Sequence, residues 1–91
     1  MFSPALPGSD LIESGIADLA RGIESIPALL VLIGAPRLRR LGLTLPAATI
    51  PCPEHRLYER LRQSEPDAAH SRYNALVRRL VSFERAAECA G

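Results

Sequence analysis

The feature that most constrains this chain is an apolar seam in its last quarter, "AHSRYNALVRRLVSFERAAECA". Its large side chains recur at spacings of four, three, four, three and four, which returns each one to the same side of an α-helix. The seam consists of Ala69, Tyr73, Leu76, Leu80, Phe83 and Ala87. This a/d spacing is typical of helices that pack against helices, and it predicts a helix over 67–90. Ser64 is the expected N-cap of that helix, which continues to about Ala90.

The spacing of the seam is compatible with two kinds of helix packed against it. An antiparallel second copy would match it layer by layer, because reversal about position 78 exchanges Tyr73 with Phe83 and Leu76 with Leu80. Alternatively, the helices expected over 10–24 and 53–63 of the same chain cover it. The sequence leaves both open.

Apolar periodicity and capping residues predict shorter helices upstream of the seam. The segment 10–24 begins at an Asp10 cap, and a short buried helix after Ser25 closes at Gly34 and Pro36. One or two basic turns then run to Gly42. A further helix covers 53–63, after a proline-rich loop over about 44–53. We therefore expect a flexible N-terminal arm at 1–9 and a single helical domain at 10–91. The predicted fold is an all-α bundle of four to five helices, with the C-terminal helix as the longest and central element.

Composition narrows the classes of function. The net charge is only +1, although the chain contains eleven arginines and no lysine. Arginine-rich composition is typical of a GC-rich, bacterial genome, and it also suits bidentate contacts to carboxylates and phosphates. The apolar run from Ile26 to Ala35 is too short to span a bilayer, which takes roughly 20 residues. Two widely spaced cysteines predict free thiols and a cytoplasmic protein without membrane contact.

The residue types that bind metals or catalyse reactions are present but badly spaced. Cys52, His55, His70 and Cys89 are the candidate soft metal ligands. On one continuous helix His70 and Cys89 would lie about 28 Å apart, so the four cannot share one tetrahedral ion. No nucleophile–base pair or glycine-rich phosphate loop is apparent. We therefore expect no metal, no cofactor and no enzymatic activity.

The seam predicts a small regulatory or adaptor protein that binds another protein, or a second copy of itself. The expected contact consists of Tyr73, Leu76, Leu80, Phe83 and Glu84, flanked by Arg72 and Arg79. Glu84 is notable because a carboxylate projects there into the apolar sector of the helix.

Two other functions are open. A nucleic-acid-binding accessory or transcription-regulatory protein would contact phosphates through arginines, namely Arg37, Arg39, Arg40, Arg78 and Arg85, together with Arg79. An inhibitor or anti-factor would instead fold over a larger bacterial enzyme, which is again a form of protein binding.

Overall fold

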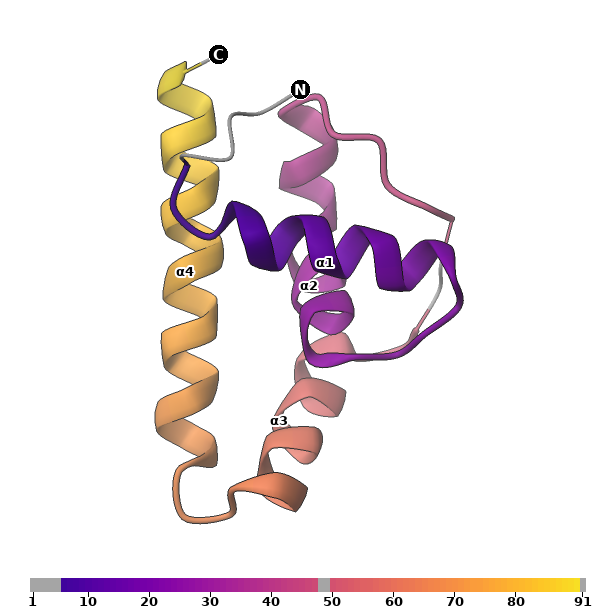
Figure 1. Ribbon diagram of the computed structural model, residues 1–91. Helices are drawn as coiled ribbons and strands as arrows, with labels where there is room; N and C mark the ends of the chain where they lie inside the picture. Colours follow the sequence, from indigo (N-terminus) through magenta and orange to yellow (C-terminus); the bar gives the residue numbers. More distant parts are fainter. Residues whose placement is uncertain (1–5, 48–49, 91) are drawn as a thin grey trace.

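The protein is all-helical in the computed structural model, which describes residues 6–47 and 50–90 apart from the side chain of Ala90 (Figure 1). Within these ranges there are four α-helices: α1 (Ser9–Ala20), α2 (Ile26–Arg40), α3 (Pro53–Ser64) and α4 (Ala69–Ala90). The predicted fold class, a small helical bundle with a long C-terminal helix, is confirmed. The longest dimension of the molecule is 38 Å, and the 22-residue α4 spans most of this length.

The helices pack around α2, which contacts the other three (Figure 1). The half of α4 nearer its C-terminus lies beside α2, and the half nearer its N-terminus lies beside α3. α1 crosses in front of α2 at a steep angle. The first turns of α2 are buried on every side: Ala28, Leu29, Leu30 and Val31 are at most 1% exposed. The prediction that the last helix is the central element is therefore wrong, because four consecutive apolar residues can all be buried only at the centre of the bundle.

α2 also continues through the residues expected to close it. The helix runs through Gly34 and Pro36 to Arg40, so the predicted short helix and basic turns are one element. A proline inside a helix removes one hydrogen bond and crowds the preceding turn. Pro36 faces solvent, however, while Ala35 and Leu38 on either side are buried. Packing of these neighbours outweighs the local cost of the proline.

Glycines end the first two helices in the same way. Gly22 and Gly42 both have positive φ, 72° and 102°. After α1, Ile23 N–H donates to Asp18 O, and after α2, Leu43 N–H donates to Leu38 O. Both are Schellman motifs, in which a left-handed residue satisfies the last carbonyls of a helix. The predicted end of the first helix at 24 is thus four residues too late.

The N-terminal caps differ from expectation in two cases. Ser25 accepts a hydrogen bond from Ala28 N–H, as its position predicts. Asp10, in contrast, lies inside α1, whose N-cap is the left-handed Gly8. Ser64 is the last residue of α3, where its hydroxyl donates to Arg60 O, and α4 begins only at Ala69. A serine hydroxyl can accept from a free N–H at the start of a helix or donate to a carbonyl at its end. The position of Ser64 in the sequence therefore does not decide between an N-cap and the end of a helix.

The predicted arm and linker fall partly outside the described residues. Residues 1–5 of the arm over 1–9 are among those not described; Leu6 packs against the core and Ser9 already belongs to α1. The proline-rich segment connects α2 to α3, and residues 48 and 49 within it are not described.

Candidate protein-binding site

The apolar seam of α4 is covered by the chain itself. Leu76, Leu80, Phe83 and Ala87 are between 1% and 7% exposed, and Ala69 is 1% exposed. Tyr73 is half-buried and its ring meets that of Tyr58 on α3 edge to face, with 5.9 Å between the ring centres. The covering surface comes from α1, α2 and α3 together. A partner therefore reaches most of these side chains only by displacing a helix of the same chain.

Glu84, the carboxylate set into the seam, lies in the interface between α2 and α4. It is 5% exposed, and its Oε1 lies 3.7 Å from Nη1 of Arg37. Nη2 of the same arginine donates to Glu88 at 2.5 Å. Burial raises the pKa of Glu84, while the charges of Arg37 and Arg40 act to lower it and that of Glu88 to raise it further. Arg37 thus joins two carboxylates of α4 to the end of α2.

The flanking arginines of the predicted interface have carboxylate partners within the chain. Arg72 Nε lies 3.1 Å from Glu65 Oε2 in the turn before α4. Arg79 Nη2 lies 3.3 Å from Asp10 Oδ1 on α1. All four side chains are about half-exposed or more, so these pairs contribute little to stability.

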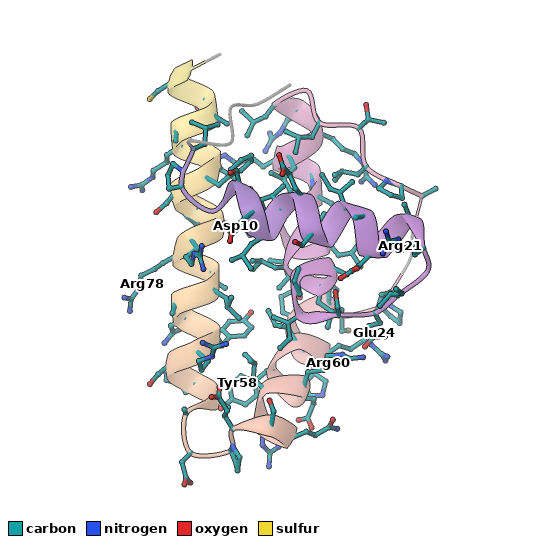
Figure 2. All side chains as sticks on the ribbon, viewed as in Figure 1. Asp10, Arg21, Glu24, Tyr58, Arg60 and Arg78 are labelled. Atoms are coloured by element: carbon teal, nitrogen blue, oxygen red, sulfur yellow. The ribbon has the colours of Figure 1, made fainter. Side chains whose placement is uncertain are left out.

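The arginines predicted to contact nucleic acid are not equivalent. Arg37 is the one already paired with Glu84 and Glu88. Arg39, Arg40, Arg78 and Arg85 are exposed, and none has a carboxylate oxygen within 4 Å in the described part of the chain. Arg78 extends from α4 away from the bundle (Figure 2). These four cations are accessible, and they are divided between the last turn of α2 and the outer face of α4.

A groove lies beside the seam, between α1 and the segment that follows α2. It encloses about 310 Å³. Ile12 and Phe83, each 2% exposed, contribute its deepest side chains, and the exposed Glu13 and Thr44 lie on its rim. Among the described residues, the groove is also lined by Ser9, Ile16, Gly42 and Leu43. Phe83 is the residue of the predicted interface that lines this groove, and its side chain is almost fully buried.

Two glycines shape the groove. Gly42, with its positive φ, turns the chain back from α2 so that Leu43 and Thr44 line one wall. Gly8 has a φ of 78°, and a Cβ there would lie 3.0 Å from Arg79 O and 3.6 Å from Phe83 Cβ. Its missing side chain lets α1 begin directly against α4 next to Phe83. Local sequence patterns do not predict this groove, because its lining comes from α1, the 42–44 segment and Phe83 of α4, which only the fold brings together.

A second, more polar hollow lies beside α3. Arg56 donates hydrogen bonds from Nε and Nη2 to the two carboxylate oxygens of Glu24, and Arg60 Nε lies 3.5 Å from the same group. Figure 2 shows Glu24 and Arg60 on facing segments. The hydrogen bond from Arg56 is the main reason why the pKa of Glu24 is lowered. The arginines hold a carboxylate of the chain itself, which ties the α1–α2 loop to α3.

The candidate metal ligands are not brought together. Both cysteines are exposed, and His70 lies 3.3 Å from the Asn74 amide on the surface of α4. Among the described residues no three His, Cys, Asp or Glu side chains are arranged to hold an ion. Nor does any described helix combine the length and apolar character needed to cross a membrane.

Comparisons with protein-family models, with curated proteins and with solved structures found no match to this chain.

Proposed function

We propose that this protein is a small regulatory or adaptor protein that acts by binding another protein rather than by catalysis. The groove between α1 and the 42–44 segment is the proposed contact. The geometry of this groove is the observation that supports the proposal. The partly exposed Ile16 and Leu43 and the exposed Glu13 and Thr44 line about 310 Å³ of space. A buried apolar centre with a polar edge is the usual anatomy of a binding surface, and this volume is at the lower end for ligand pockets.

The site differs from the contact expected from the seam because most of the seam is buried within the chain. A homodimer or a partner packed along α4 would need the interface with α2 and α3 to open. The groove requires no such opening, since a partner side chain can approach between α1 and the 42–44 segment. An inhibitory contact with a larger enzyme would use the same groove.

A blocking substitution tests this role. Thr44→Arg places a long side chain on the groove rim at an exposed position, where folding tolerates it. Ser82→Arg adds the same charge at an exposed position on the outer face of α4 and is the matched control. We expect immobilised wild type and Ser82→Arg to retain the same protein from a lysate of the source cells, and Thr44→Arg to lose it. Equal retention by all three would rule out the groove.

Nucleic-acid binding is a second candidate, favoured by accessible arginines that have no carboxylate partner among the described residues. Arg39, Arg40, Arg78 and Arg85 are four of them, and Arg21 at the end of α1 is a fifth. Non-specific phosphate contacts are strongest at low salt, because each one releases counterions. A mobility-shift titration with random duplex and single-stranded DNA at about 50 mM salt therefore tests it. The expected signature is a shift that disappears when Arg78 and Arg85 are both changed to Gln. Absence of a shift at this salt concentration excludes the candidate.

A further inference from the structure

We propose that the polar hollow beside α3 is a binding site for a phosphate monoester, and that Glu24 occupies this site as a competitor within the chain. The anion-binding side chains are Arg56 and Arg60, which lie one turn apart on α3. Their guanidinium groups already hold an oxyanion, the carboxylate of Glu24, and arginine binds phosphate oxygens in the same bidentate way. This hollow shares no lining residue with the groove between α1 and the 42–44 segment.

Glu24 differs from the other paired carboxylates of the described chain because two arginines hold it together. The others that have an arginine partner have only one. Arg56 donates from Nε to one oxygen of Glu24 and from Nη2 to the other. Arg60 adds a single long contact, 3.5 Å from its Nε. The two terminal nitrogens of Arg60 donate no hydrogen bond within the described residues, so they are available to the oxygens of a ligand.

The hollow gives an anion room to enter. It has a volume of about 440 Å³, and among the described residues its lining is entirely polar: Glu24, His55, Arg56, Glu59, Arg60 and Gln63. The side chains of Arg56 and Arg60 are 47% and 43% exposed, so a ligand reaches both from solvent. The charge of Glu59 is matched by Arg62, 3.2 Å away. Departure of Glu24 alone therefore leaves two uncompensated cations facing the hollow.

Glu24 can leave these arginines without breaking a helix. It lies in the connection between α1 and α2, between the left-handed Gly22 and the cap residue Ser25. A phosphate monoester carries a charge of about −1.5 to −2 at pH 7 and has three strong acceptor oxygens, whereas a carboxylate has one charge and two oxygens. It can therefore compete with Glu24 for both arginines at once. Its binding would release the α1–α2 connection from α3.

The test uses the full chain labelled with ¹⁵N at constant ionic strength, which keeps the screening of surface charges the same throughout. Two probes carry the phosphate: glycerol phosphate and a capped Ala-phosphoserine-Ala peptide. We expect both to move the amide signals of Glu24 and residues 55–60, and the unphosphorylated peptide to leave these signals in place. The probe that binds more tightly identifies the carrier of the phosphate as a small molecule or a phosphorylated protein.

Glu24→Gln removes the competing charge and should tighten phosphate binding about two- to tenfold, since exposed ion pairs change an equilibrium by factors of this size. Glu59→Gln is the matched control, because it removes the same charge from the same hollow but pairs with neither arginine of the site; it should have the smaller effect. Arg60→Gln should weaken binding, whereas Arg85→Gln on α4 should leave it unchanged. The inference is overturned if Glu24→Gln binds phosphate no more tightly than Glu59→Gln, or if neither phosphate moves these signals at millimolar concentration.

Discussion

At Gly15 helix α1 approaches α2 closely, and replacement of this glycine by alanine tests the packing between the two helices. A Cβ at Gly15 would lie 2.3 Å from Pro27 O and 2.5 Å from Val31 Cγ2 on α2. Ordinary contact begins near 3.4 Å, so α1 would have to retreat by about 1 Å from a backbone carbonyl that cannot rotate away. α1 has its most extensive contact with α2, so this retreat loosens much of the core.

The magnitude follows from two opposing effects. Overpacking against a rigid neighbour costs about 3 kcal/mol, the upper end of the usual range. The higher helix propensity of alanine relative to glycine offsets about 1 kcal/mol of this cost. We therefore expect Gly15→Ala to lower the free energy of unfolding by about 2 kcal/mol, against a total of roughly 5–14 kcal/mol for a chain of this length. The melting temperature should fall by about 8–16 °C.

Gly34→Ala is the matched control, since it also adds a methyl group to a buried helical glycine. There the new Cβ would meet the methyl groups of Leu80, at 2.8 and 3.1 Å, and Glu84 Oε2 at 3.1 Å. These are ends of flexible side chains, so the clash should cost only about 1 kcal/mol and be offset by the gain in propensity. Urea unfolding followed by circular dichroism measures both variants. If Gly15→Ala is as stable as wild type, or no less stable than Gly34→Ala, the reasoning is refuted.

Three further predictions concern a cap, the core centre and the buried carboxylate. Ser25→Ala loses both the N-cap of α2 and the hydrogen bond to Asp18, and should cost about 1–2 kcal/mol by urea unfolding; an unchanged midpoint would contradict the cap. Leu29→Ala, at a fully buried position, should cost about 2–5 kcal/mol, and a smaller loss would argue against α2 as the central helix. Glu84→Gln tests the raised pKa of the buried carboxyl. The pKa of Glu84 in the folded protein lies above its unfolded value, which is near 4.5. Protonation of Glu84 therefore stabilises the fold below pH 4.5, and this stabilisation is lost as the pH rises through the pKa of the folded protein. Wild type should therefore gain stability relative to Glu84→Gln as pH falls from 7 to 4.5, as measured by thermal unfolding across that range, and a parallel pH dependence of the two proteins would refute it.

The long-range order of the fold was only partly accessible from local patterns. Apolar periodicity correctly predicted an all-helical bundle and a long last helix, because a face of buried side chains must repeat with the helical period. The prediction that a helix ends at Pro36 was wrong, because proline disfavours a helix locally but the burial of Ala35 and Leu38 stabilises one. That burial is a tertiary effect. Gly22 and Gly42 are residues typical of helix ends, but only the hydrogen-bond pattern shows at which residue each helix ends.

By itself, the sequence determined which side chains must leave water: the seam of α4 and the unbroken apolar run of α2. Those requirements follow from the period of the helix and the amount of apolar surface. Only the tertiary structure decided that they cover each other within one chain, that Glu84 meets Arg37, and that α1 and the 42–44 segment leave a groove between them. The physical reason is that contacts between distant segments depend on the crossing angles of helices and on close approaches such as the one at Gly15. Local periodicity carries no information about either.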